Sequence, residues 1–266
     1  MSTTAEPVNA TRQNPFPANW PARLAWIGLV AYSFYAASLF DLTWDRFVVG
    51  IDNGARFIGR MLPPYLGKWD LLAKGLLESL EISIIATMVG VVIAMPIGLL
   101  GARNLMPAWV TWPVRGLIAM CRSFHPVIVA ILFVKAVGFG ALAGIMALIV
   151  ASIGFIAKLF AEAIEEISLK QVEAVRATGA GFGNVLVMAV QPQVLARFIG
   201  FSTYQLDSNL RNSTMVGIVG GGGIGSTLFT AFQRFDYDFV LTILICIISM
   251  IMVGEILSGW VRRTFQ

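Results

Sequence analysis

The sequence predicts an all-α integral membrane protein with about six transmembrane helices. Hydrophobic residues make up 57% of the 266 residues, and charged residues make up only 13%. A soluble domain of this length carries roughly a quarter charged residues, so the composition excludes an ordinary soluble protein. The apolar residues form long runs, and one helical crossing of a bilayer needs about 20 such residues. The net charge of +4 is small and does not indicate nucleic acid binding.

The N-terminal part is predicted to contain a polar tail, one transmembrane helix and a connector. Residues 1–22 are polar and rich in proline, and residues 23–42 hold the first apolar run. Residues 43–74 alternate charged and apolar groups, with Trp44 and Trp69 among them, which favours an amphipathic helix at the membrane interface. A solvated connector is the alternative.

Residues 75–263 are predicted to form the core of the protein. We expect its spans at 75–100, 116–138, 140–160, 194–219 and 239–260. The span at 116–138 is unusual because it carries Arg122, His125 and Lys135. Along one straight helix, at ~1.5 Å per residue, these side chains would lie ~10, ~15 and ~30 Å deep. The two cysteines lie in separate apolar runs and provide no disulfide framework or metal site.

A polar-flanked segment at about 161–193 interrupts the apolar runs. Ser168 with Gln171 three residues later predicts a capping box and a helix that begins at Leu169. Gly179 is predicted to end that helix in a left-handed turn. A second short helix is expected from Phe182 to Val190, closed by Pro192.

This segment resembles the signature loop of permease subunits of bacterial ABC importers. The family pattern is E-A-A, three residues, G, nine residues, I-x-L-P, and Glu173, Ala174, Gly179 and Pro192 stand at matching positions. Val175, Ala189 and Gln191 depart from the pattern, although its spacing is intact. The resemblance implies a type I importer fold with a cytoplasmic coupling helix, and it assigns coupling to the ATPase to Glu173, Ala174, Arg176, Gly179 and Pro192. An ordinary amphipathic loop helix is the alternative.

Six glycines between residues 217 and 225 follow the fifth span. The stretch contains G-x-G-x-x-G, but a dinucleotide site also needs a βαβ unit. The same stretch resembles a P-loop motif, but the lysine of that motif is missing. A helix break inside the membrane is the better interpretation, because such breaks occur at transporter binding sites and gates. A flexible external loop is the alternative. The predicted gate residues are Gly217, Gly220, Gly222, Gly223 and Gly225.

Ionisable groups inside a bilayer are costly and usually face a polar pathway or a partner. Asp207 and Arg211 are four residues apart on one helical face and are expected to neutralise each other. Residues 204–228 resemble permease subunits of phosphonate importers, as do Arg122 and the segment from Arg176 to Ala180. This resemblance implies a pathway for phosphorus oxyanions. The predicted pathway residues are Arg122, His125, Asn209, Arg211, Ser213 and Thr214; charge pairing between helices is the alternative for the arginines.

The resemblance further implies a transport subunit that is not itself an enzyme. No cofactor is expected in this chain; ATP and Mg²⁺ would bind the separate ABC ATPase subunits. The other expected partners are an external substrate-binding protein, a second permease copy and membrane lipid. Lysine and arginine gather on one side of six spans, which predicts an inner membrane protein with both termini in the cytoplasm. The alternatives are a methionine-type ABC permease and an ion-coupled secondary transporter.

Overall fold

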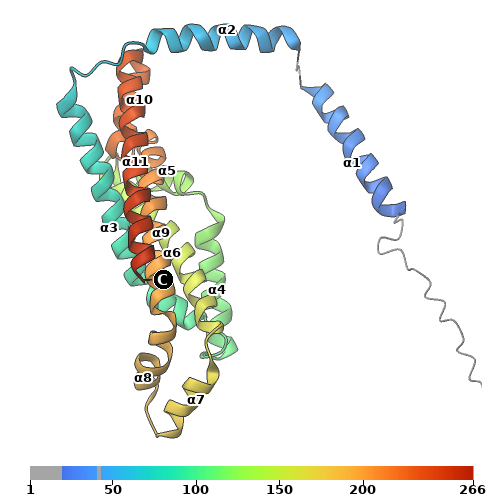
Figure 1. Ribbon diagram of the computed structural model, residues 1–266, viewed down its shortest axis with the longest axis vertical. Helices are drawn as coiled ribbons and strands as arrows, with labels where there is room; N and C mark the ends of the chain where they lie inside the picture. The colour runs from blue at the N-terminus through green and yellow to red at the C-terminus, as the bar shows by residue number, and fades with distance from the viewer. Residues whose placement is uncertain (1–19, 41–42, 266) are drawn as a thin grey trace, which may run out of the picture. The chain divides into compact units, whose positions relative to one another are not determined.

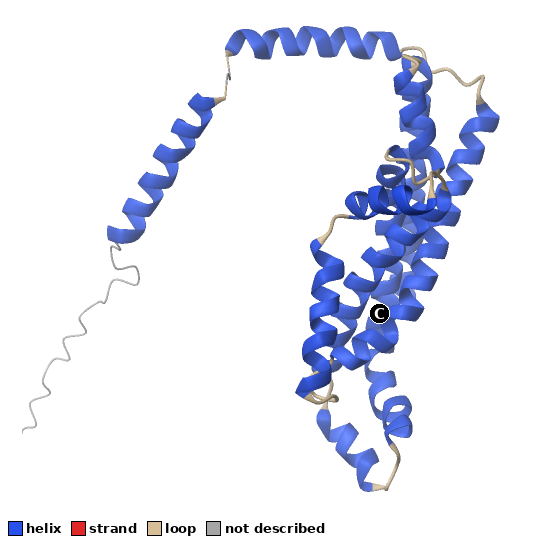
Figure 2. Ribbon diagram, turned by 180° about the vertical axis from the view of Figure 1, so that it is seen from behind, coloured by secondary structure: helices blue, strands red, loops and turns tan. Residues whose placement is uncertain are grey.

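The structure is a computed structural model that describes residues 20–40 and 43–265. It divides into two compact units, residues 1–59 and 60–266. Its described secondary structure is entirely helical (Figures 1 and 2). The predicted all-α membrane fold is therefore confirmed. Most of the predicted tail, residues 1–19, lies outside the described residues.

The first unit contains α1 (Trp20–Leu39) and almost all of α2 (Trp44–Met61). Helix α1 begins three residues before the predicted boundary at residue 23 and buries no side chain. Helix α2 confirms a helix in the connector. Its polar face carries the Arg56–Asp52 ion pair of 2.7 Å, and Trp44 and Phe47 contact each other at its start. Whether α2 lies in a membrane interface stays a prediction.

The second unit is a bundle with a helical loop at one end. In both views α7 and α8 extend beyond one end of the long helices, and α10 lies near the other (Figures 1 and 2). Its elements are α3 (Trp69–Gly101), α4 (Ala108–Ser123), α5 (Pro126–Val137), α6 (Ala141–Glu165), α7 (Leu169–Ala177), α8 (Phe182–Val185), the π-helix η1 (Leu186–Val190), α9 (Gln191–Ile218), α10 (Gly223–Gln233) and α11 (Tyr237–Phe265).

Small residues bring α3 and α6 close together in the centre of this bundle. A Cβ atom on Gly90 would lie 2.5 Å from the Cβ of Ser152, and one on Gly98 would lie 2.9 Å from the carbonyl oxygen of Ala157. Close approach of this kind lets helices gain packing contacts where lipid supplies no hydrophobic driving force. The sequence of α3 and α6 thereby fixes the framework on which α4, α9 and α10 pack.

Five helical stretches of the described residues are long and apolar enough to cross a membrane. The number becomes six if the bent pair α4 and α5 is counted as one span. The predicted continuous span at 116–138 is wrong, because α4 ends at Ser123 and α5 turns away by 90°. Helix α3 also begins at Trp69, six residues before the predicted start.

Proline explains the break between α4 and α5. Phe124 and His125 adopt extended backbone conformations directly before Pro126. A proline ring disfavours helical geometry at the preceding residue, and proline fits well in the first turn of the next helix. The depths that were counted along one straight helix are therefore wrong beyond Ser123, most of all for Lys135 in α5.

Candidate functional site

Helix α7 presents one face to the bundle and leaves the other open. The predicted start at Leu169 is confirmed. Val172 is buried in an apolar cluster with Ala163, Ile164 and Val185, among others, while Glu173, Ala174 and Arg176 are exposed. The apolar face holds the helix in place, so the exposed face is free to contact a partner.

The predicted capping box is absent at the start of α7. The Ser168 side chain makes no capping hydrogen bond; the backbone N–H of Ser168 instead donates to Oε1 of Gln193 at 2.9 Å. The side-chain amide of Gln193 donates in turn to the carbonyl oxygen of Ala189 at 2.6 Å. Gln193 therefore joins the beginning of the loop to the helix that leaves it.

Gly179 ends α7 in the left-handed conformation that the sequence predicts. Its φ angle is +77°, and its N–H donates to the carbonyl oxygen of Arg176 at 3.0 Å. A Cβ atom would meet nothing within 4 Å, so backbone conformation alone, and no lack of space, favours glycine here.

Pro192 does not close a helix, contrary to the sequence prediction. Helix α8, the π-helix η1 and α9 follow one another without a loop, and Pro192 lies in the first turn of α9. The N–H of Gln191 donates to the carbonyl oxygen of Leu186, the wider spacing of a π-helix. Because the hydrogen bonding is already shifted at this point, the missing N–H of proline does not end the helix.

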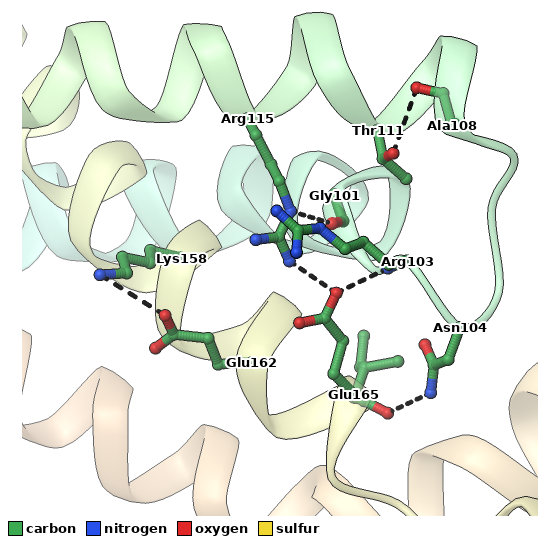
Figure 3. Close-up of polar contacts among 10 residues, drawn as sticks. Gly101, Arg103, Asn104, Ala108, Thr111, Arg115, Lys158, Glu162 and Glu165 are labelled. Carbon is green, nitrogen blue, oxygen red and sulfur yellow. Dashed lines mark hydrogen bonds and ion pairs between the residues drawn. The ribbon is translucent and has the colours of Figure 1, made fainter.

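Three polar contacts tie the α7–α8 loop to the bundle. Arg197 of α9 pairs with Glu166, directly after α6. Arg115 of α4 pairs with Glu165 at 2.6 Å and also donates to the carbonyl oxygen of Gly101 at 2.9 Å (Figure 3). Glu165 accepts a further bond of 2.7 Å from the N–H of Arg103. The beginning of the loop, at Glu165 and Glu166, is thus fixed to α4 and α9, which sequence patterns did not reveal.

Asn209 lies at the centre of a buried polar cluster between α3, α6 and α9. Its side-chain amide donates to Thr87 at 2.9 Å and to Ser152 at 2.8 Å. Its carbonyl oxygen accepts from Gln205 at 3.0 Å, and Gln205 also donates to Ser152 at 3.1 Å. All four side chains are buried. Thr87, Ser152 and Gln205 were not among the predicted site residues, although isolated polar residues within apolar spans were the available signal.

The expected pairing of Asp207 with Arg211 is confirmed, at 2.8 Å. Asp207 is buried, whereas 42% of the Arg211 side chain is exposed. Nearby, Ser213 donates to the carbonyl oxygen of Leu210, and Thr214 is buried. Within the described structure, Oδ1 of Asp207 and the hydroxyl of Thr214 are buried without a hydrogen-bond partner.

Arg122 and His125 lie on different elements from the α9 residues. Arg122 is at the end of α4, where its backbone and stem pack on Gly154 of α6. His125 caps α5, accepting from the N–H of Val127 at 3.3 Å through Nδ1. No polar contact within the described residues joins either side chain to Arg211.

The glycine-rich stretch forms a buried break between α9 and α10. Residues 221–225 are buried, and Gly220, Gly222 and Gly223 have positive φ angles. A Cβ atom on Gly225 would lie 2.0 Å from the carbonyl oxygen of Thr214, and one on Gly217 would lie 2.4 Å from that of Gly222. Ser79 of α3 accepts from the N–H of Ile224 at 2.9 Å. These observations confirm a helix break and contradict a flexible loop, and the position of the break inside the membrane stays a prediction.

Comparisons with known proteins agree with this arrangement. Residues 94–266 match the family described as "Binding-protein-dependent transport system inner membrane component". The chain is 36% identical over 240 residues to the phosphite transport system permease protein PtxC of Stutzerimonas stutzeri, covering 90% of this chain and 86% of the relative.

A second relative is longer than this chain. The phosphate-import permease protein PhnE of Mycolicibacterium smegmatis is 40% identical over 208 residues, which is 76% of this chain but 38% of the relative. This chain therefore matches well under half the length of that relative.

Among solved structures, the MetNI methionine ABC transporter in inward-facing conformations has a matching chain with a TM-score of 0.66 and 25% identity. The match covers 75% of this chain and 97% of that chain. The fold is thus that of a type I ABC importer permease. The chain belongs to the family of inner membrane components of binding-protein-dependent transport systems, as a permease subunit similar to that of a phosphite transport system.

Proposed function

We propose that this chain is the permease through which an ATP-driven importer moves a phosphonate or related phosphorus oxyanion into the cytoplasm. The observation that carries the proposal is the 36% identity to a phosphite permease over 90% of this chain. ATP and Mg²⁺ bind the partner ATPase in this proposal, and the permease alternates between inward-open and outward-open states.

Coupling to the ATPase is assigned to α7. Its exposed Glu173, Ala174 and Arg176 form the face offered to a groove in the partner, while buried Val172 holds the helix to the bundle. The contacts of Gln193 and Arg197 connect the start of the loop to α9. A displacement of α7 would therefore be passed to the helix that carries Arg211.

The oxyanion pathway is assigned to the open side of α9. Arg211 leaves 42% of its side chain exposed there, and buried Thr214 follows one turn later on the same helix. Asn209 and Ser213 are buried on the opposite side of α9, so for them a role in the pathway stays a prediction. Basic groups along a pore select anions. The buried glycine break that follows α9 is proposed as the gate, because a tightly packed junction between two helices can adopt discrete arrangements. For Arg122 and His125, a role in the pathway stays a prediction.

The assembly proposed is two copies of the permease with two ATPase subunits, supplied by an external binding protein. The termini and α7 are placed on the cytoplasmic side. The second copy would cover the exposed part of the Arg211 side chain, whose charge is already paired with Asp207.

ATP hydrolysis in liposomes tests the proposal. The chain is reconstituted with its ATPase and binding protein, and the rate is measured with the binding protein empty or loaded with phosphonate, phosphite, hypophosphite, phosphate or methionine. Stimulation by one phosphorus oxyanion is expected. No stimulation by any ligand, together with uptake that follows a proton gradient, would instead indicate a secondary transporter.

Two variants test the residue assignments in the same assay. Gly179→Asp is expected to uncouple hydrolysis from uptake, with Gly183→Asp in α8, where a Cβ atom also meets nothing within 4 Å, as the matched control. Arg211→Ala is expected to reduce uptake while the complex still assembles. Unchanged uptake in both variants would remove the coupling and pathway assignments.

Methionine import is the second candidate. The chain is 30% identical to the probable D-methionine permease MetI of Pasteurella multocida over 210 residues, which cover 97% of that protein. Stimulation by methionine alone would keep the importer and discard the oxyanion pathway.

A further inference from the structure

A charged pocket lies between α4 and α6, at the end of the bundle nearest α7. It has a volume of about 190 Å³ and is lined by Arg115, Ile118, Ala119, Arg122, Lys158, Ala161 and Glu162. The lining residues repeat at three- and four-residue spacing on both helices, so one stripe of each helix forms a wall. One water occupies roughly 30 Å³ in the liquid, so a polyatomic anion can be accommodated.

The charges in the pocket favour an anion. Glu165 neutralises Arg115 at 2.6 Å, and Glu162 lies 3.4 Å from Lys158 (Figure 3). Arg122 takes part in no ion pair among the described residues and is exposed. The pocket lining thus holds three cations and one carboxylate, and Glu165 beside Arg115 is a second carboxylate outside the lining. A guanidinium matches the oxygen geometry of a phosphate group with two parallel hydrogen bonds.

The remaining walls favour an anion that is attached to an apolar body. Ile118, Ala119 and Ala161 supply apolar surface next to the cations. A free oxyanion gains nothing from such surface, whereas the glycerol and upper acyl chain of a phospholipid can cover it.

Exposed tryptophans indicate that the N-terminal end of α4, on the Arg115 side of the pocket, lies at a membrane boundary. Trp112, three residues before Arg115, is 77% exposed, and Trp109 one turn earlier is 79% exposed. Tryptophan is enriched at the level of lipid headgroups, and basic pockets between transmembrane helices there bind anionic headgroups.

We propose that the α4–α6 pocket binds the phosphate group of an anionic phospholipid from the leaflet on the α7 side. Arg122 and Lys158 contact the phosphate, and Arg115, held by Glu165, adds to the positive field. The lipid joins α4 to α6 beside the Arg115–Glu165 contact that fixes the beginning of the α7–α8 loop. This inference does not depend on the transported substrate, and it gives Arg122 a lipid partner in place of the predicted oxyanion.

Native mass spectrometry of the full chain, delipidated in detergent, tests the proposal. Dioleoylphosphatidylglycerol is titrated against dioleoylphosphatidylcholine, and the melting temperature is followed with each lipid. Wild type should bind phosphatidylglycerol more tightly and gain stability from it. Each cation removed, in Arg122→Gln and Lys158→Gln, should weaken binding about fivefold, and the double variant about 25-fold.

Lys135→Gln is the matched control, because Lys135 is an exposed cation on α5 outside the pocket. Its affinity should equal that of wild type. If the Arg122 variant fails to fold, Lys158→Gln alone carries the test, since it removes only a surface pair with Glu162.

Three results would overturn the proposal. The first is equal affinity of the double variant and the Lys135 control for phosphatidylglycerol, and the second is equal binding of the two lipids by wild type. The third is displacement of phosphatidylglycerol by millimolar phosphite or phosphate, which would show that the pocket binds a free oxyanion instead of a lipid. A failure of the importer assay would leave these binding results unaffected, so the two hypotheses can be separated.

Discussion

The glycine break and the α7–α8 loop are both turns between helices, but different physical demands determine their sequences. At the break, Gly217 and Gly225 lie where any side chain would collide with backbone atoms. In the loop, Gly179 has open space around it and is favoured only by its positive φ angle. Packing therefore permits almost no residue except glycine at the break. The loop instead keeps an exposed face whose residues can contact a partner.

Gly225→Ala should have the largest effect on stability. Its methyl group would lie 2.0 Å from the carbonyl oxygen of Thr214 and 2.9 Å from the Cα of Gly217, neither of which can rotate away. We expect a loss of about 3 kcal/mol, seen as low yield and a depressed melting temperature in detergent. Gly259→Ala, which meets nothing within 4 Å, is the control. Equal melting temperatures for the two variants would contradict the packing argument.

Asn209→Leu should have the next largest effect. The change keeps the approximate volume but removes one of the two acceptors of Gln205, one of the two donors to Ser152 and the donor to Thr87, in a buried site. We expect a loss of about 2 kcal/mol in thermal unfolding. The comparison is Asn212→Leu, since half-buried Asn212 makes only a 3.4 Å contact with Ser208. A larger loss from the Asn212 change would argue against the buried cluster.

Gly179→Ala should have a modest effect that is confined to the loop. An L-residue at this φ angle costs about 1 kcal/mol, and Gly179→Asn should cost less because asparagine tolerates the left-handed region. Hydrogen exchange of α7 amides should rise in the alanine variant while α9 amides keep their protection. Faster exchange in α9 would show that the loop and the bundle do not unfold separately.

Glu173→Ala should leave stability within about 0.5 kcal/mol, because the side chain is exposed and makes no contact that holds the fold. It should nevertheless weaken binding of the partner ATPase, measured by co-purification. Val172→Ala on the buried face should instead lower the free energy of unfolding by about 2 kcal/mol and leave binding of the ATPase unchanged. A destabilised Glu173 variant with normal ATPase binding would remove the functional interpretation of this face.

Sequence patterns predicted the features that depend on local chemistry. The left-handed turn at Gly179, the start of α7 and the ion pair of Asp207 with Arg211 each depend on residues within a few positions of one another. The helix break at 219–222 was also recognised, because a dense run of glycines has few other structural uses in an apolar chain.

Features that depend on distant partners were not predicted. The cap of α7 comes from Gln193, 25 residues away from Ser168, so a local capping pattern was misleading. The hydrogen bonds among Thr87, Ser152 and Gln205 form only when α3, α6 and α9 pack together. The bend before Pro126 is a different case, since the local signal was present but the hydropathy of the surrounding run suggested one continuous span.

The π-helix between α8 and α9 gives the chain some tolerance in its own length at that point. A turn in which Gln191 bonds to Leu186 contains one residue more than an α-helical turn. Deleting one residue from 186–190 would therefore restore an α-helical turn and leave α8 and α9 nearly in phase. The same deletion in the regular part of α9, at 194–198, would rotate every preceding residue by about 100° about the helix axis. Val185 would then leave its place beside Val172, and α7 would lose its packing although every helix remained intact. A single-residue deletion should therefore be better accepted in 186–190 than in the helix that follows it.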